Sequence, residues 1–187
     1  MSPTRLLPSS TVVRRWAAAL GLALAATAVQ AQTAGAASAY GLDLNFVDDH
    51  GTPRALAEWR GRPVVIAMAY GACRSVCSST LRTLEAVQSA ADRKGVAIDV
   101  VVVSIAPAED TPQAWAQYRQ SHHLLRPNWT FLSGRPAPTR VLARFLGVRF
   151  WNYDEHVMHD FKVLRLGPDG AIAATLEWNH RGVDALL

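Results

Sequence analysis

Two nearly continuous apolar runs constrain the fold of this chain most strongly. Residues 63–70 read Pro-Val-Val-Ile-Ala-Met-Ala-Tyr, and residues 97–105 read Ala-Ile-Asp-Val-Val-Val-Val-Ser-Ile. A strand with one face in water alternates apolar and polar side chains, whereas a strand covered on both faces reads as a continuous run. Between the two runs, residues 75–94 carry apolar side chains at helical spacing. We therefore expect two parallel central strands joined by a helix.

The rest of the chain continues the alternation of strands and helices. Strand patterns cover residues 42–47, 129–132, 161–166 and 171–177, with a turn at 49–51 and a short segment at 55–60; helical patterns begin at Asp110-Thr111-Pro112 and cover residues 139–146. Gly-Pro-Asp-Gly at 167–170 is a turn by its chemistry, so the last two strands should form an antiparallel hairpin. This order predicts an α/β fold, a thioredoxin-like sandwich with a mixed central sheet and an N-terminal β extension.

The first 31 residues read as a secretory leader. They hold three arginines and no acidic residue, and an apolar segment is followed by small residues at Val29-Gln30-Ala31. Residues 32–41 are small and polar and are interpreted as a linker, which leaves residues 42–187 as one domain. A leader of this kind predicts an exported, periplasmic protein.

An uncleaved membrane anchor through residues 16–40 is the alternative to a cleaved leader. Its apolar core of about fourteen residues is shorter than the roughly 20 that span a bilayer, which favours cleavage. If the anchor is retained, the domain is attached to the inner membrane.

The charge of the chain argues against a nucleic-acid partner. The whole sequence has a formal net charge of +4, but removal of the leader and its three arginines lowers the value to +1. The remaining arginines are scattered and do not interleave with aromatic side chains, as a base-stacking groove would require. We therefore expect no nucleic-acid binding.

Both cysteines of the chain lie in one motif, Cys73-Arg74-Ser75-Val76-Cys77, where the first apolar run ends and the next helix begins. The N-terminus of a helix and a neighbouring arginine favour the thiolate form. Residues four apart on a helix face the same way, so the pair can chelate one ion, and two thiolates select soft ions such as Cu(I) or zinc. The alternatives are a plain disulfide and two buried thiols.

A metal bound by two sulfurs needs a third ligand, and histidine is the best candidate. His50, His122, His123 and His180 lie in segments that predict solvated side chains. His156 and His159 stand just before the closing hairpin, in a loop that faces the cysteines in a thioredoxin-like fold. Met158 lies between them and is interpreted as an axial ligand or, more commonly for methionine, a core residue. The pattern alone leaves His156 and His159 as alternatives.

These motifs resemble the Sco/SenC family of copper chaperones, named for synthesis of cytochrome c oxidase, over residues 42–177. The matching blocks are Gly61-Arg62-Pro63-Val64-Val65, Tyr70 with Cys73 and Cys77, Val103-Ser104-Ile105 with Pro107 and Asp110-Thr111-Pro112, and residues 129–134. His159 stands eleven residues before Gly170, which is the offset of the family's copper-ligand histidine. The resemblance therefore implies that Cys73, Cys77 and His159 bind copper, as Cu(I) or Cu(II), and it selects His159 over His156.

The resemblance also implies a function and partners. It implies delivery of copper to a respiratory oxidase, with the copper subunit of the oxidase or other copper chaperones as partners. The alternative is a thiol–disulfide oxidoreductase acting on cysteines of oxidase assembly partners, in which Cys73 and Cys77 are the catalytic pair.

Three positions depart from the family's pattern. Arg74 and Ser78 stand where family members usually have proline after each cysteine, and Ala106 replaces the acidic residue before Pro107. The proline losses are expected to loosen the cysteine loop, and the alanine removes a group that could contact a partner or orient a ligand.

Overall fold

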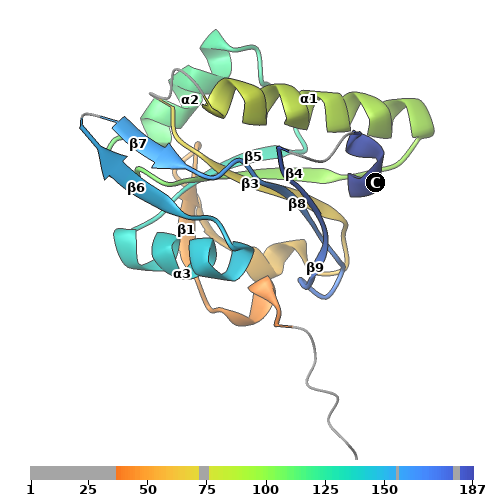
Figure 1. Cartoon of the computed structure of the whole chain (residues 1–187), viewed down its shortest axis with the longest axis horizontal. Helices are drawn as coiled ribbons and strands as arrows, with labels where there is room; N and C mark the ends of the chain where they lie inside the picture. Colours follow the sequence, from red (N-terminus) through yellow and green to blue (C-terminus); the bar gives the residue numbers. More distant parts are fainter. Residues whose placement is uncertain (1–36, 72–75, 155, 179–181) are drawn as a thin grey trace, which may run out of the picture. The chain divides into compact units, whose positions relative to one another are not determined.

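The computed structural model describes residues 37–71, 76–154, 156–178 and 182–187 (Figure 1). These residues belong to one compact unit, residues 34–187. The expected leader, and the anchor as far as residue 36, lie outside the described residues. Within the described part of the chain, the helices are all too short or too polar to span a bilayer.

Seven strands of the described residues form one mixed sheet in the order β2-β1-β5-β4-β3-β8-β9. Its centre is parallel: β3 (Val64–Ala69), β4 (Asp99–Ser104) and β5 (Trp129–Ser133) run side by side in one direction. Both edges are antiparallel, formed by β1 (Asn45–Asp48) with β2 (Pro53–Ala55), and by β8 (Val163–Leu166) with β9 (Ile172–Leu176). The expected mixed sheet with an N-terminal β extension is confirmed.

Helices cover both faces of this sheet. In Figure 1, α1 (Val76–Lys94) and α2 (Pro112–Ser121) lie over one face, and α3 (Pro136–Leu146) lies over the other. This covering explains the two apolar runs, because every residue of β3 is buried and so are five of the six residues of β4. Trp115 of α2 packs on Phe131 of β5 with ring centroids 5.1 Å apart, which joins the helix to the sheet.

Local chemistry sets the ends of the helices. Thr111 caps α2 by accepting a hydrogen bond from the Ala114 amide, and Pro112 occupies the first turn, where its missing N–H costs nothing. Helix α3 begins at Pro136, three residues before the predicted start, because proline is also preorganised for a first turn. It ends at Leu146, as predicted, and Gly147 follows as the C-cap with a left-handed φ of 64°.

The structure differs from the predictions at the end of the linker. Ala39–Gly41 forms a 3-10 turn in which Ala39 and Tyr40 are buried, so the last residues of the segment 32–41 belong to the packed domain. Tyr40 also explains Gly170, which has a φ of 83° and where a Cβ atom would stand 2.6 Å from the tyrosine ring. The closing hairpin therefore holds the start of the domain in place.

A second difference concerns the segment expected to be a loop before the closing hairpin. Strands β6 (Phe150–Tyr153) and β7 (His156–His159) form a separate two-stranded antiparallel sheet. His156 and His159 therefore lie on a strand, and the prediction of a loop was wrong. The alternation of side chains along β7 decides which of its residues face the rest of the domain.

Candidate metal centre

The cysteine motif lies between the end of β3 and the start of α1. Cys73 is among residues 72–75, outside the described part of the chain, and Cys77 is the second residue of α1. Tyr70 and Gly71, which lead into the motif, are both described. Among the residues that the structure describes, no three His, Cys, Asp or Glu side chains gather closely enough to hold a metal ion. The candidate site is therefore built from the residues that frame the motif.

Asp110 holds the start of the cysteine loop. One of its carboxylate oxygens accepts a hydrogen bond from the Gly71 amide at 2.9 Å, and the other accepts one from the Ser104 hydroxyl at 2.5 Å. The Ser133 hydroxyl donates to the main-chain carbonyl of the same aspartate. Asp110 thus ties together the ends of β3, β4 and β5, which are neighbours in the sheet.

Burial raises the pKa of Asp110 above its ordinary value, although the hydrogen bonds from Ser104 and Gly71 act in the opposite direction. Sequence reasoning placed Asp110 at the beginning of a helix and in a block shared with the family, and missed its contact with the loop. One feature of the sequence could have indicated this contact. Thr111 already caps the helix, so the aspartate before it is not needed for capping and is available for another contact.

His159 is the one of the two candidate histidines that faces the domain. It is the last residue of β7, its side chain is 5% exposed, and its ring meets the Tyr70 ring edge-on with centroids 6.4 Å apart. Tyr70 is the residue that directly follows β3, three positions before Cys73. The structure therefore brings His159 to the strand end from which the cysteine loop departs.

The hydrogen bond of His159 selects its tautomer. Its Nδ1 atom lies 2.9 Å from the main-chain carbonyl oxygen of Asp160, and because a carbonyl only accepts, Nδ1 carries the proton. The lone pair of the neutral ring is then on Nε2, the arrangement that metal-binding histidines use. Burial lowers the pKa of His159 below its usual value, which outweighs the raising effect of Asp160 and favours the neutral, ligating form.

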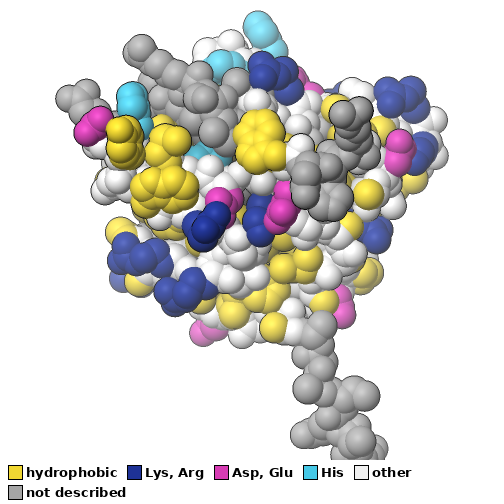
Figure 2. All heavy atoms as spheres, in the orientation of Figure 1, with side chains coloured by type: hydrophobic (Ala, Val, Ile, Leu, Met, Phe, Trp, Pro, Cys, Tyr) yellow, Lys and Arg dark blue, Asp and Glu magenta, His cyan; other side chains and the backbone are white. Residues whose placement is uncertain are grey.

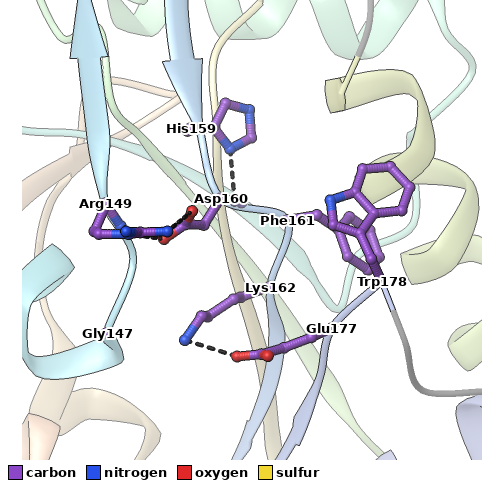
Figure 3. Close-up of a pocket in the computed structure, with 8 residues that line it drawn as sticks. All are labelled: Gly147, Arg149, His159, Asp160, Phe161, Lys162, Glu177 and Trp178. Atoms are coloured by element: carbon purple, nitrogen blue, oxygen red, sulfur yellow. Dashed lines mark hydrogen bonds and ion pairs between the residues drawn. The ribbon is translucent and has the colours of Figure 1, made fainter.

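Arg149 fixes Asp160 and thereby the carbonyl that orients His159 (Figure 3). The guanidinium binds both carboxylate oxygens, with Nε–Oδ2 at 2.9 Å and Nη2–Oδ1 at 3.0 Å. The main-chain amide of Arg149 donates to the same carboxylate, and the Asp160 amide donates to the Arg149 carbonyl. Arg149 lowers the pKa of Asp160, so this carboxylate is ionised at neutral pH. Sequence reasoning missed this pair, which closes the unexpected hairpin.

A pocket of about 460 Å³ opens beside His159. The labelled side chains of Figure 3 line it, with His159 and Asp160 at one end and Phe161, Lys162, Glu177 and Trp178 around the rest. Lys162 pairs with Glu177 at 2.8 Å, and Trp178 lies over Phe161 with ring centroids 4.5 Å apart. The polar groups of the pocket are thus largely paired with one another.

The other sequence candidates lie away from this position. His156 and Met158 are exposed and alternate with His159 along β7, so they point to the opposite face of the strand. The interpretation of Met158 as a core residue was wrong, since 39% of it is exposed. His50, His122 and His123 are exposed, as predicted, and His180 is outside the described residues.

The sequence model of the SCO1/SenC family matches residues 32–185. The chain belongs to the SCO1/SenC family. No curated protein matches the chain.

Solved structures of this family share the fold. A copper-bound ScoI from Arabidopsis thaliana matches with a TM-score of 0.67 at 22% identity, over 76% of this chain and 90% of that one. A SCO1/SenC family lipoprotein from Bacillus anthracis matches with 0.64 at 17% identity, over 71% and 81% of the two chains. BsSco, a cytochrome c oxidase assembly protein with a disulfide switch, matches with 0.64 at 18% identity, over 71% and 80%. The thioredoxin-like fold is therefore confirmed.

Of the three departures from the family's pattern, the structure describes the surroundings of Ala106. Its amide donates a hydrogen bond to the Ser104 hydroxyl at 3.0 Å, and its carbonyl accepts one from the Asp110 amide. Ala106 is therefore part of the tight turn that places Asp110. Arg74 lies outside the described residues, and Ser78 is the third residue of α1.

Proposed function

We propose that this SCO1/SenC protein binds copper through Cys73, Cys77 and His159 and takes part in the assembly of the copper site of a cytochrome c oxidase. The observation that carries the proposal is the position of His159, buried and edge-on to Tyr70 at the strand end that leads into the cysteine motif. The copper-bound relative and the oxidase assembly protein BsSco support it.

Chain connectivity limits how far the cysteines can lie from the histidine. Cys73 follows Tyr70 by three residues, so an extended chain carries it at most about 11 Å from that residue. Cys77 stands in the first turn of α1, whose start must be reached from Gly71 within five residues. The two proposed sulfur ligands would therefore lie at the same end of the sheet as the His159 ring.

The donor set suits copper. Two thiolates are soft ligands that favour Cu(I) over hard cations, and a neutral imidazole completes a three-coordinate site. His159 meets the requirement for a neutral ring, because burial lowers its pKa and Nδ1 is committed to the Asp160 carbonyl. Copper in this role is cargo that must also leave, so the position near the molecular surface next to an open pocket is favourable.

Delivery of copper outside the cytoplasm follows from the same proposal. The leader-like residues 1–31 and the Bacillus anthracis lipoprotein relative support an exported protein held at or near a membrane. The partner would be the copper subunit of the oxidase or another copper chaperone, and the place of action the periplasm.

A thiol–disulfide exchange function is the second candidate, supported by the disulfide switch of BsSco. In this role one thiolate of the Cys73–Cys77 pair attacks a partner disulfide, and the second resolves the mixed disulfide. The partner is then reduced to two thiols while Cys73 and Cys77 become a disulfide. This reaction needs no histidine ligand, which separates it from copper binding.

The variant His159→Ala tests the proposal, with His156→Ala as its matched control. We expect His159→Ala to weaken Cu(I) binding strongly in competition with a chelator of known affinity, while dithiol oxidation and reduction remain measurable. His156→Ala should bind copper at this site like the wild type, because its side chain points to the other face of β7. X-ray absorption of the copper-loaded wild type should show two Cu–S contacts and one Cu–N contact. Unchanged copper affinity in His159→Ala would exclude the three-ligand site, and full affinity in Cys73→Ser would place the site elsewhere.

A further inference from the structure

The outer face of the β6–β7 hairpin carries four side chains that the inner site does not use. Cross-strand pairing places Trp151 opposite Met158 and Tyr153 opposite His156. Side chains two residues apart on a strand share a face, so all four lie together. The inner face holds Phe150, Val157 and His159, which are more buried. We call Trp151, Tyr153, His156 and Met158 the outer face.

This outer face is unusually apolar for its exposure. Trp151 is 48% exposed, Tyr153 63% and Met158 39%, which makes them three of the seven large hydrophobic residues exposed among the described ones. Figure 2 shows hydrophobic and histidine side chains gathered over β6 and β7. Large apolar side chains left in water next to a histidine on so short a hairpin indicate a binding surface.

The spacing of the outer face suits a small ion. His156 and Met158 are two residues apart on one strand, which puts their Cβ atoms roughly 6.6 Å apart, and both side chains can bend toward a shared ion. Trp151 lies directly across from Met158, at a Cβ separation of roughly 5 Å. An imidazole nitrogen, a thioether sulfur and the face of an indole ring can therefore approach one point on this face.

We propose that the outer face of β6–β7 binds one Cu(I) ion, through His156 and Met158 beneath the Trp151 ring, at a site separate from Cys73, Cys77 and His159. Thioether sulfur is a soft ligand that selects Cu(I) and leaves hard cations in water. The indole face attracts a cation through its quadrupole. The ion stays monovalent, and no electron transfer is involved.

Two features of the hairpin support a cation at this place. Asp154, which has a φ of 51° in the turn, is exposed beside Tyr153 and adds negative charge near the outer face. His156 and His159 belong to one strand and lie on its opposite faces, so the outer ion and the inner candidate site would lie on opposite sides of β7. The site goes beyond the proposed function and shares no ligand with it.

The first test uses Ag(I), a redox-inert ion with the charge and softness of Cu(I), on the full chain carrying Cys73→Ser, Cys77→Ser and His159→Ala. With methionine labelled by 13C at its methyl group, Ag(I) should shift the Met158 resonance and leave Met68, buried in β3, unmoved. Met158→Leu and His156→Asn should each weaken Ag(I) binding by at least about tenfold, since even the loss of a ligand's supporting partner costs that much. His122→Asn, which removes an exposed histidine at the C-cap of α2, should leave it unchanged.

The ring contact has its own readout. Ag(I) should quench indole fluorescence in the triple variant, Trp151→Phe should abolish that change, and Trp178→Phe, which removes another exposed tryptophan, should preserve it. The same titration on the wild type keeps the proposal testable if the triple variant does not fold. In the wild type, the Met158 methyl resonance should shift with the second equivalent of Ag(I), after the inner site is filled. A Met158 methyl that stays in place at saturating Ag(I), or binding that Met158→Leu does not weaken, overturns the proposal. If only the inner site proves wrong, Ag(I) should still bind at the outer face. Failure of one proposal is therefore distinguishable from failure of the other.

Discussion

The Nδ1 atom of His159 lies 2.9 Å from the main-chain carbonyl oxygen of Asp160, whose carboxylate is held by Arg149 at the base of the same hairpin. A carbonyl that accepts from the second ring nitrogen of a histidine sets both its tautomer and its ring direction. Here the carbonyl belongs to the next residue in the chain, so its direction depends on the local backbone. Arg149, which directly precedes β6, stabilises that backbone in addition to the ion pair: its amide donates to the Asp160 carboxylate, and its carbonyl accepts from the Asp160 amide.

Arg149→Ala should weaken copper binding severalfold and leave the fold intact. The arginine does not contact His159 and acts through the Asp160 backbone, so the loss should stay below the roughly 10- to 100-fold typical of removing a direct partner of a ligand. Competition with a Cu(I) chelator measures the affinity. X-ray absorption should show greater disorder in the Cu–N distance.

Lys162→Ala is the matched control for Arg149→Ala. Lys162 lines the same pocket and its ion pair with Glu177 has a similar length, but neither residue bonds to Asp160 or His159 in the described contacts. It should therefore keep wild-type copper affinity. Equal losses in the two variants would mean that pocket charge, and not the orientation of His159, sets the affinity.

Asp110→Ala should destabilise the fold and displace the cysteine loop. Asp110→Asn should have a smaller effect on both the stability and the loop. Alanine leaves the Gly71 amide and the Ser104 hydroxyl without their buried acceptor, at a cost of about 1–3 kcal/mol. Asparagine can still accept from Gly71 and donate to Ser104. Chemical denaturation measures the stability, and the Cu(I) competition assay measures the site. If alanine and asparagine behave alike, hydrogen bonding by Asp110 does not hold the loop.

Asp110 should also lower stability as the pH rises from acid toward neutral. Because burial raises its pKa in the folded protein, the folded state keeps a proton that the unfolded chain has already released above its ordinary pKa. The free energy of unfolding therefore falls as pH rises through this interval. Asp110→Asn removes the effect, so its stability relative to the wild type should increase over the same range. Denaturation curves at a series of pH values test this, and a constant difference between the two proteins would contradict it.

The central fold could be predicted because burial on both faces removes polar side chains from a strand. Residues 63–70 and 97–105 show this directly, and they correspond to β3 and β4. The β6–β7 hairpin could not be recognised in the same way. Its outer face carries Trp151 and Tyr153 in water, so apolar residues do not mark the buried side. In a short strand with apolar residues on its exposed face, the alternation of apolar and polar side chains does not indicate which face is buried.

The candidate ligands could be selected from the sequence, but the residues that position them could not. The offset of His159 from Gly170 distinguished it from His156 through family resemblance. Arg149 and Asp160 are eleven residues apart and meet only because the unexpected hairpin pairs their strands. Asp110 and Gly71 are separated by 39 residues, and their contact depends on the order of strands in the sheet. Such contacts depend on which strands are neighbours in the sheet, and the sequence around each residue does not show this.

Gly71→Ala should lower copper affinity, because the residue lies at the crowded start of the cysteine loop. A Cβ atom at this position would stand 3.2 Å from the Asp110 carboxylate, 3.5 Å from Tyr118 and 3.7 Å from Trp115. The first distance is too short for an undisturbed contact, so the hydrogen bond from the Gly71 amide must lengthen or the loop must shift. Overpacking of this kind costs about 1–3 kcal/mol of stability.

Gly41→Ala provides the comparison for Gly71→Ala, since its added Cβ would meet no atom within 4 Å. Thermal unfolding and the Cu(I) competition assay should both distinguish the two alanine variants, with loss of stability and affinity confined to position 71. If Gly71→Ala binds copper as tightly as Gly41→Ala, the start of the loop can move without disturbing the metal ligands. The positioning role given to Asp110 would then be wrong, because its contact with Gly71 is the path by which it reaches the loop.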